Sequence, residues 1–356
     1  MVRIDREDFR LRARFRGAMR RAGVQAGDRL LIAVSGGADS VALFDLVARD
    51  AATRGWLLCV GHVDHALRSD SADDCAWVDA LARSRGVDFH GTRLRGSPAH
   101  GESVEAWARR GRRAALRKMA AWTGARWILL AHHQDDQAET LLLQLLRGAG
   151  LEGLCAMAPV RPPFVRPLLD SRREELRGYL RRRDLEWRED PSNSSPRFAR
   201  NRLRASVLPL LEREFGPAVT RLLARTSDAL RPIRAAERRR IAAALANARV
   251  ESHPDPREAG IRLDRPKLRS YDRATLEGCV RAAFRSVQGS TRNLKRAHVL
   301  ALAELARLGP PRILHLPDGV IARVDRVHLR LEPAPRSVSR EFPPSVNELG
   351  GVEACT

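Results

Sequence analysis

The sequence predicts an α/β protein in which a parallel sheet carries helices on both faces, followed by a smaller helical domain with a short β region. Apolar runs of strand length alternate with amphipathic helical stretches through the first half of the chain, and such βα repeats form parallel sheets. From about residue 205, long amphipathic helices take over. A chain of 356 residues is long enough for two domains. We therefore expect domains over 1–211 and 212–331 and a disordered tail over 332–356.

The elements of the first domain follow from hydrophobic periodicity and from capping residues. Ser103 suits the N-cap of a long helix. The leucines of 136–147 recur at helical spacing until Gly148, which suits a helix end. Together these signals predict strands over 30–34, 56–60, 87–92 and 126–131 and helices over 76–84, 103–119 and 136–147.

The second half begins with a segment rich in proline, 159–167, which predicts an extended connector. Ser171 stands three residues before Glu174, the spacing of a capping box that would open a helix to residue 183. Gly216 and Pro217 predict a break in the helical stretch 208–246. Further signals predict helices over 272–287 and 292–308, short strands within 312–331 with turns at 317–319 and 325–326, and disorder from residue 332.

The composition favours an anionic partner and a reducing compartment. Lys and Arg total 64 against 43 for Asp and Glu, a formal net charge of +21, which favours nucleic acid; a solvated basic surface without a partner is the alternative. The five cysteines form no Cys-x-x-Cys pair, which argues against zinc, iron–sulfur and disulfide sites. The chain has no apolar run long enough to span a bilayer and no apolar signal core. We expect a cytoplasmic protein without membrane attachment.

A candidate phosphate site follows the first predicted strand. Glycines let the backbone turn tightly and approach a ligand, while free N–H groups at the next helix start and serine hydroxyls would face an anion. Asp39 places a carboxylate where a nucleotide would bring Mg²⁺. The segment is not a Walker A loop, because no Gly-Lys-Ser/Thr follows; a glycine-rich turn without a ligand is the alternative. The loop consists of Ser35, Gly36, Gly37, Ala38, Asp39 and Ser40.

A second polar cluster follows the strand predicted over 126–131. His132, Asp135 and Asp136 stand at the start of the next helix. Imidazole and carboxylates together can bind metal, transfer protons or hold a cation, whereas helix capping by either aspartate is the alternative. Because the carboxyl ends of parallel strands lie at one edge of the sheet, we expect this cluster beside the phosphate loop.

Three further segments contain candidate ligand contacts. The alternatives are, in chain order, a loop with satisfied polar groups, a solvated helix face and a plain basic loop. His65 follows the second predicted strand, where adenosine or ribose could be contacted. Arg109 and Arg112 share one helix face, and paired guanidiniums suit a phosphate in a transition state or an RNA backbone. A basic segment that suits RNA phosphates contains Arg200, Asn201 and Arg204.

The loop Ser-Gly-Gly-x-Asp-Ser resembles the PP-loop of the N-type ATP pyrophosphatases, which have an adenine nucleotide alpha hydrolase-like fold. The motifs together resemble the tRNA(Ile)-lysidine synthase family from about residue 28 to 211, and more weakly over 212–331. Arg113 departs from the family, which usually has tyrosine there, and longer members carry a further C-terminal domain. The resemblance is carried by Val-Asp-His-x-Leu-Arg, Glu-Ala-x-Ala-Arg-x-x-Arg, His-His-x-Asp-Asp-x-x-Glu-Thr and Arg-Asn-x-Leu-Arg.

The resemblance implies ligation of free L-lysine to cytidine 34 in the CAU anticodon of tRNA(Ile). The cytidine O2 would attack the α-phosphate of ATP and release pyrophosphate, and the lysine ε-amine would then attack C2 and expel AMP. It implies that Mg²⁺ binds to Asp39 and that Arg112, with Arg109, stabilises charge at the α-phosphate. His132, Asp135 and Asp136 remain unranked as the group that binds or deprotonates the lysine.

Two other functions fit parts of the sequence. A tRNA thiolation enzyme would adenylate a base through the same loop, although it normally needs paired or catalytic cysteines. A non-catalytic tRNA-binding paralogue would keep the fold, although the intact acidic and histidine motifs argue against it. The family resemblance is compatible with a homodimer.

Overall fold

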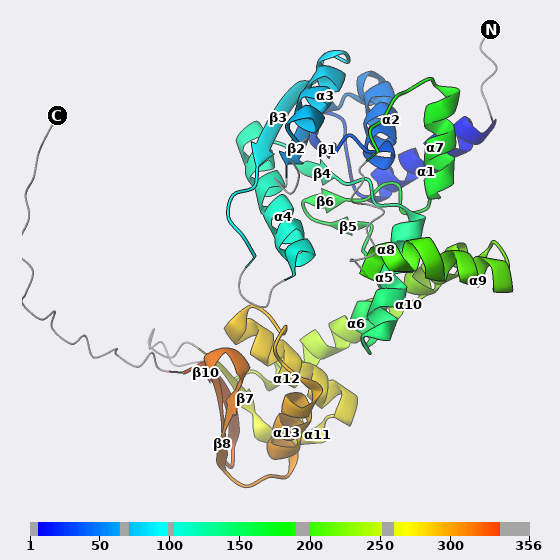
Figure 1. Ribbon diagram of the computed structural model, residues 1–356. Coiled ribbons are helices and arrows are strands. Elements are labelled where there is room, and N and C mark those ends of the chain that lie inside the picture. Colours follow the sequence, from blue (N-terminus) through cyan, green and yellow to red (C-terminus); the bar gives the residue numbers. More distant parts are fainter. Residues whose placement is uncertain (1–5, 65–70, 99–102, 190–198, 251–259, 335–356) are drawn as a thin grey trace, which may run out of the picture. The chain divides into compact units, whose positions relative to one another are not determined.

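The computed structural model of the protein describes residues 6–64, 71–98, 103–189, 199–250 and 260–334 (Figure 1). The chain forms two compact units that divide between Arg234 and Ala235. This division lies inside helix α10 (Val219–Ala248), on the C-terminal side of the domain boundary expected after residue 211. Within the described ranges, no helix combines the length and the apolar character needed to cross a bilayer.

The first unit is built on a six-stranded sheet. Its strands are β1 (Arg29–Ala33), β2 (Leu57–Asp64), β3 (Asp88–Arg93), β4 (Trp127–Leu129), β5 (Val160–Arg161) and β6 (Phe164–Val165). They stand in the order β3-β2-β1-β4-β6-β5, and every neighbouring pair is parallel except β5 with β6. The predicted parallel α/β fold is thus confirmed, and β1 and β4, which precede the two candidate site segments, are adjacent.

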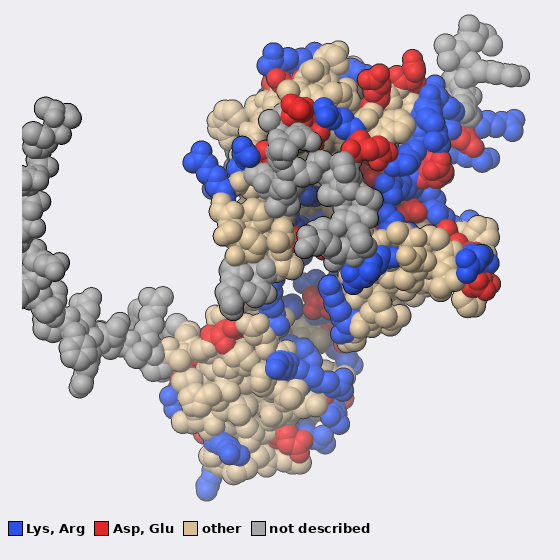
Figure 2. Space-filling model, viewed as in Figure 1, with Lys and Arg blue, Asp and Glu red and all other residues tan. Residues whose placement is uncertain are grey.

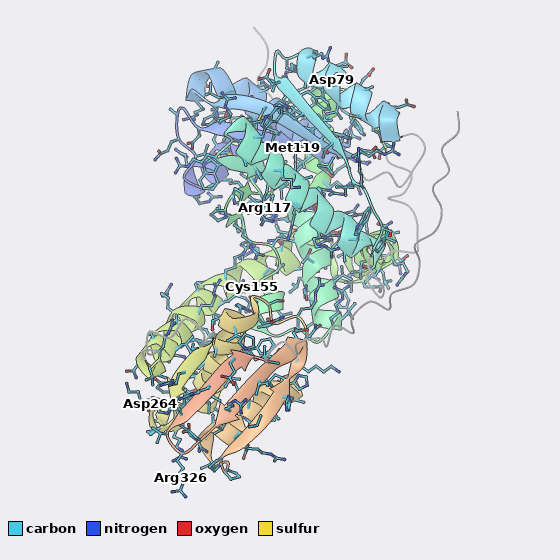
Figure 3. All side chains as sticks on the ribbon, turned by 90° about the vertical axis from the view of Figure 1, so that its left-hand side faces the viewer. Asp79, Arg117, Met119, Cys155, Asp264 and Arg326 are labelled. Carbon is cyan, nitrogen blue, oxygen red and sulfur yellow. The ribbon has the colours of Figure 1, made fainter. Side chains whose placement is uncertain are left out.

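Helices cover both faces of this sheet, as the sequence predicts. The helices are α1 (Arg6–Arg21), α2 (Ala38–Arg54), α3 (Ser71–Arg83), α4 (Val104–Thr123), α5 (Gln134–Leu146), α6 (Leu151–Leu154), α7 (Arg173–Arg182), α8 (Ala199–Arg202) and α9 (Leu208–Phe215), with a π-helical turn, η2 (Leu203–Val207), between the last two. Leu30 and Ile32 of β1 pack in the core with α1, α2, α3 and α7, whereas Leu31 packs in the core with α4. Because side chains alternate across a strand, β1 is buried on both faces. Figure 3 shows α4 across one face of the sheet, with Met119 on this helix.

Three local expectations for the first unit were wrong or incomplete. The predicted connector 159–167 is a hairpin: Pro162 and Pro163 occupy its turn, so β5 and β6 pair and extend the sheet. The helix α7 begins at Arg173, and the backbone N–H of Arg172 donates to Glu175 at 2.8 Å, so the cap lies one residue beyond the predicted one. Helix α1, which was not predicted, buries Leu11, Phe15 and Met19 along one face.

The second unit pairs an antiparallel sheet with helices, and the predicted helices and strand turns of this region are found. Its strands β7 (Ile261–Asp264), β8 (Arg312–Leu316), β9 (Val320–Val324) and β10 (His328–Pro333) stand in the order β7-β10-β9-β8. Its helices include α11 (Arg265–Ser270), α12 (Arg273–Gln288) and α13 (Arg296–Arg307). Strand β10 continues through Glu332 and Pro333, which were expected in the tail; residues 335–356 lie outside the described ranges.

Candidate active site

The predicted phosphate loop connects the end of β1 to the start of α2. Gly36 has a φ of +90°, which glycine adopts without steric cost. The Ser40 hydroxyl donates to the Gly37 carbonyl at 2.8 Å, accepts from the Ser35 N–H at 3.1 Å and lies 3.2 Å from the Ser35 hydroxyl. A Cβ at Gly37 would approach no described heavy atom closer than 3.7 Å. The loop is therefore stabilised by hydrogen bonds among its own residues.

The start of α2 supplies the donors that an anion needs. Gly37 is the N-cap, and the first hydrogen bond within the helix is made by the N–H of Ser40. The N–H groups of Ala38 and Asp39 precede it and belong to the donors that a helix start leaves without an intrahelical acceptor. Such donors, together with the helix dipole, form an anion site.

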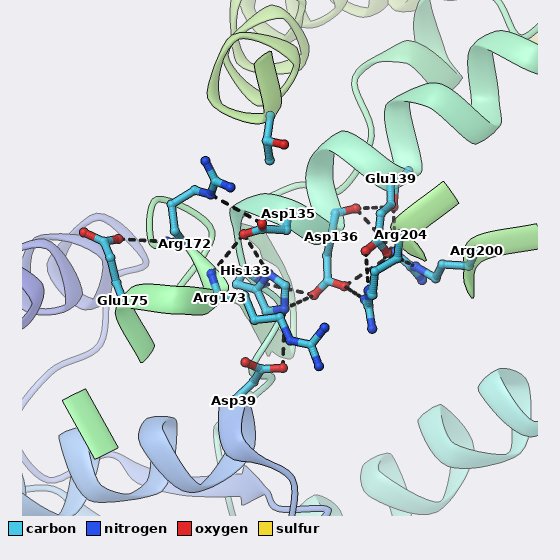
Figure 4. A network of polar contacts seen from close by, with 12 residues as sticks. Asp39, His133, Asp135, Asp136, Glu139, Arg172, Arg173, Glu175, Arg200 and Arg204 are labelled. Atoms are coloured by element: carbon cyan, nitrogen blue, oxygen red, sulfur yellow. Dashed lines mark hydrogen bonds and ion pairs between the residues drawn. The ribbon is translucent and has the colours of Figure 1, made fainter. Parts of the chain in front are cut away.

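The segment after β4 meets this loop through His133 (Figure 4). The His133 Nε2 atom lies 3.4 Å from Asp39 Oδ2 and 3.6 Å from Asp136 Oδ2, and its Nδ1 atom lies 3.5 Å from Asp135 Oδ2. The His133 side chain is buried. The expected juxtaposition of the two segments is confirmed, but the imidazole that joins them is His133, which the sequence analysis did not select, and not its neighbour His132.

His132 and His133 differ in protonation at neutral pH. Burial disfavours the charged form of His133, but Asp136, Asp135 and Asp39 outweigh it and raise the pKa of the imidazole to about 10. Burial lowers the pKa of His132 to about 3, and the nearby arginines add to this effect against the attraction of Asp136. His133 is therefore an imidazolium and His132 a neutral imidazole.

The carboxylates stay ionised because His133 and several arginines face them. Burial works against ionisation, yet the attraction of the nearby His133 imidazolium and the hydrogen bond from the N–H of Arg173 lower the pKa of Asp135 to about 2. The pKa of Asp136 lies well below its usual range for similar reasons, with His133 and Arg200 the largest attractions that oppose its burial. Asp135 is also fixed in place, because it accepts the Arg173 N–H at 2.9 Å and lies 3.3 Å from Arg172 Nε.

A buried carboxylate one turn further along α5 anchors the predicted basic segment. Glu139 is fully buried and lies 2.7 Å from the Nε atoms of both Arg200 and Arg204. Arg204 also lies 3.4 Å from Asp136 Oδ1. These two guanidiniums, predicted from the sequence to contact RNA, thus form ion pairs with the carboxylates of the site. They keep 16% and 25% side-chain exposure, so their contact with phosphate, and that of Asn201 in α8, stays a prediction.

Asp39 is the residue that fits a divalent cation best. Its Oδ1 atom is buried and has no hydrogen-bond partner among the described residues. Within those residues, no group of three His, Cys, Asp or Glu side chains could hold a metal by itself. This is compatible with Mg²⁺, which is usually held by one or two carboxylates together with substrate phosphates.

The remaining candidates lie on α4 or outside the described ranges. Arg109 is exposed and pairs with Glu105 at 2.8 Å. Arg112 reaches the surface in a crowded region, where desolvation and the charges of Arg109 and Arg113 lower its pKa, although a guanidinium stays protonated. Its charge also contributes to the low pKa of His132, so the two residues lie near each other. His65 lies outside the described residues.

Comparison with known proteins agrees with this geometry. Residues 11–211 match the PP-loop domain family. The chain is 43% identical over 301 residues to a Thermus thermophilus protein named tRNA(Ile)-lysidine synthase, covering 83% of this chain and 55% of that one. It is 36% identical over 349 residues to a Symbiobacterium thermophilum protein of the same name, covering 92% and 71%. The chain spans about half the length of several curated relatives that it matches.

One solved structure shows that the fold is shared more widely. The U34-tRNA thiolase NcsA from Methanococcus maripaludis aligns with a TM-score of 0.55 at 14% identity, covering 63% of this chain and 78% of that one. The fold alone therefore does not distinguish ligation from thiolation, and the identification rests on the sequence relatives and the PP-loop match. The chain belongs to the tRNA(Ile)-lysidine synthase family of PP-loop proteins.

Proposed function

We propose that the protein ligates free L-lysine to C2 of cytidine 34 in tRNA(Ile) with a CAU anticodon, through an O2-adenylated cytidine, and releases AMP and pyrophosphate. The observation that carries the proposal is the juxtaposition of a phosphate loop with an acidic and histidine cluster. His133 lies 3.4 Å from Asp39 at the adjoining ends of β1 and β4. The phosphate loop suits the phosphates of ATP, and the acidic and histidine cluster suits a substrate cation.

In the first step, the loop binds the departing pyrophosphate. Its helix-start N–H groups and the Ser35 hydroxyl are the donors, while the Ser40 hydroxyl, which donates to the Gly37 carbonyl, keeps the loop in shape. Mg²⁺, when bound to Asp39 and the phosphates, would neutralise part of the charge that develops there. Arg112 is the guanidinium that we assign to the α-phosphate, where it would stabilise negative charge in the transition state.

In the second step, the lysine ε-amine must lose a proton, because its free pKa is about 10.4. Asp135 and Asp136 remain carboxylates at neutral pH and suit the ammonium. His133 already carries a proton and cannot accept another. His132 is neutral, and its buried Nδ1 atom has no hydrogen-bond partner among the described residues. We assign it as the proton acceptor, since bound phosphates would raise its pKa toward the range of a general base.

The described cysteines favour ligation over sulfur transfer. Burial raises the pKa of Cys59, Cys75 and Cys279, and Cys155 is buried. A cysteine that attacks or carries sulfur needs a lowered pKa and access to solvent. The cysteine environments in the described part of the chain therefore support the lysine reaction.

A pyrophosphate-release assay tests this proposal. With ATP, lysine and tRNA(Ile) of CAU anticodon, we expect continuous turnover to AMP and pyrophosphate. Without lysine, release should stop near one pyrophosphate per enzyme, because the adenylated tRNA would accumulate. The same tRNA with uridine at position 34 should support no release. Production of ADP and phosphate, or release that is independent of tRNA, would contradict the proposal.

A further inference from the structure

We propose that Arg113, Arg117 and Arg161 form a binding surface for RNA phosphates on the catalytic unit, which we call the arginine face. The inference rests on the proposed function and extends it, because it names where the tRNA backbone beside the reacting nucleotide would be held. The arginine face consists of residues of the first unit that do not belong to the PP-loop. It combines residues of α4 with one residue of the β5–β6 hairpin.

Helical spacing places the first two arginines in one row. Arg113 and Arg117 are four residues apart on α4, and Arg109 stands four residues before Arg113, so all three lie along one side of the helix. With a rise of 1.5 Å per residue, the row extends about 12 Å along the helix axis. Arg109 is partly neutralised by Glu105, which leaves Arg113 and Arg117 as the strongly cationic part.

The hairpin brings the third arginine to the same place. The Arg117 guanidinium carbon lies 4.9 Å from the centre of the Phe164 ring of β6. Arg161 is the direct antiparallel partner of Phe164, and directly paired residues project their side chains to the same side of a sheet. Phe164 belongs to the core packed against α4, so Arg161 also projects toward α4.

These arginines have no acidic partners in the described part of the chain, and none of Arg113, Arg117 and Arg161 forms an ion pair there. Desolvation, followed by the charges of Arg109, Arg161 and Arg117, lowers the pKa of Arg113. By contrast, two arginines of α1, on the other face of the sheet, are neutralised: Arg12 and Arg16 both contact the Asp50 carboxylate at 2.6 Å.

An anionic ligand would relieve this concentration of like charge. Guanidiniums bind phosphate through planar, bidentate contacts. Arg113 and Arg117, about 6 Å apart along the helix axis, together with Arg161 on a separate strand, offer several such contacts and suit successive phosphates better than one small anion. The arginine face also lies close to a candidate active-site residue, because Arg113 directly follows Arg112 on α4. Burial together with Arg113 and Arg161 lowers the pKa of Arg166 to about 10, and Arg166 in turn contributes to the low pKa of His132. The backbone of an RNA whose base enters the active site is therefore the occupant we assign.

Two triple variants test the arginine face in the full-length protein. Arg113→Gln with Arg117→Gln and Arg161→Gln removes three charges from it. The matched control, Arg10→Gln with Arg20→Gln and Arg54→Gln, removes three exposed charges from α1 and α2, on the other face of the sheet. Binding of labelled tRNA(Ile) is measured against salt concentration, and the thermal midpoint of each protein is recorded as a check of folding.

The first triple variant should raise the Kd for tRNA about tenfold or more at low salt. It should also reduce the slope of log affinity against log salt by about 2 to 3, roughly one for each lost phosphate contact. The KM for ATP should stay within about twofold. The control variant should keep the wild-type slope. A third variant with lysine at positions 113, 117 and 161 keeps the charge and should keep most of the slope, which separates charge from packing on Phe164.

The outcomes distinguish this inference from the proposed function. If the wild type makes lysidine but the first triple variant keeps the wild-type Kd and slope, the arginine face does not bind RNA and the proposed function stands. If the wild type makes no lysidine but binds RNA through these arginines, the proposed function fails and the surface assignment stands. Equal losses in the first variant and the control would show a general effect of net charge and would overturn the assignment.

Discussion

The two carboxylate oxygens of Asp39, in the first turn of α2, have different surroundings. Its Oδ2 atom lies 3.4 Å from the His133 imidazolium, whereas its buried Oδ1 atom has no hydrogen-bond partner among the described residues. A carboxylate with one oxygen near an imidazolium and the other without a hydrogen-bond partner suits a metal ion that arrives with a nucleotide. The imidazolium orients the side chain without occupying both oxygens.

Replacing Asp39 with alanine should abolish adenylation while the fold survives. We expect the rate of pyrophosphate release to fall about a thousandfold, which corresponds to ~4 kcal/mol of transition-state stabilisation. The thermal midpoint and the Kd for tRNA should stay close to wild type, because Asp39 is a partly exposed ligand and not a core residue. Asp170→Asn, at an exposed pair with Arg21, is the control. Near-normal turnover of folded Asp39→Ala would refute the metal role.

Single residues of the site could be predicted only where a spacing pattern defines them. Ser35 to Ser40 form one local unit between a strand and a helix, so their roles follow from neighbouring sequence. The choice between His132 and His133 depends instead on which imidazole turns toward Asp39, and that is set by the pairing of β4 with β1. Glu139 follows Asp136 at helical spacing, which could have indicated a shared face, but its two arginine partners lie far away in sequence.

At the scale of elements, a buried ion-pair cluster fastens α1 to α2. Asp50 of α2 is fully buried and contacts Arg12 and Arg16 of α1, each at 2.6 Å. Burial opposes ionisation, but the hydrogen bonds from the two arginines lower the pKa of Asp50. Because its pKa in the folded state lies below the unfolded value of about 3.9, the carboxylate stabilises the fold fully above that value. This stabilisation is lost as the pH falls through the folded-state pKa.

Asp50→Asn should therefore destabilise the protein most at neutral pH. We expect a loss of about 2 to 3 kcal/mol at pH 7, at the low end for breaking a buried pair because both arginines are partly exposed. The difference from wild type should narrow at pH 3, because this lies below the unfolded value of about 3.9 and the carboxylate of the unfolded wild-type chain is then mostly protonated. Urea unfolding at the two pH values measures this, and Asp79→Asn, at an exposed pair within α3, should change stability by less than about 0.5 kcal/mol. An equal loss at both pH values would contradict the ion-pair explanation.

The elements that sequence patterns identified are those whose stabilising contacts are local. Ser103 caps α4 as predicted, because its hydroxyl accepts the Ala106 N–H three residues on. The hairpin of β5 and β6 was missed because two prolines suggest a connector, whereas here they occupy a turn and leave the short flanking strands free to pair. The capping residue of α7 was misplaced because Ser171 is used by the preceding turn, where its N–H donates to the Leu168 carbonyl.

At the scale of the whole molecule, the net charge of +21 comes from arginines of two kinds. Some pair with buried carboxylates, and others are exposed. Figure 2 shows Lys and Arg side chains on the visible faces of both units. In the first unit, many arginines pair with buried carboxylates such as Asp45, Asp50 and Glu139. In the second unit, α10 carries exposed arginines such as Arg238 and Arg239. The total charge, read from composition, could indicate a polyanionic partner but not which arginines are structural.

We expect the exposed arginines of the second half to bind tRNA largely through its phosphates. Replacing Arg238, Arg239 and Arg292 with glutamine should weaken tRNA binding and reduce the slope of log affinity against log salt by about 2 to 3. Adenylation at saturating tRNA should survive, because these positions lie outside the catalytic unit. Lysine replacements at the same positions are the control for charge. An unchanged slope in the glutamine variant would show that this half does not contact the RNA backbone.

The most direct test of the central claim is mass spectrometry of the nucleosides from reacted tRNA(Ile). The protein is incubated with ATP, isotopically labelled lysine and tRNA carrying the CAU anticodon, and AMP is quantified in parallel. We expect cytidine 34 to be replaced by a nucleoside heavier by one labelled lysine less one water, with one AMP formed per modified tRNA. An unmodified cytidine 34 despite AMP formation, or a sulfur-containing nucleoside at that position, would contradict it.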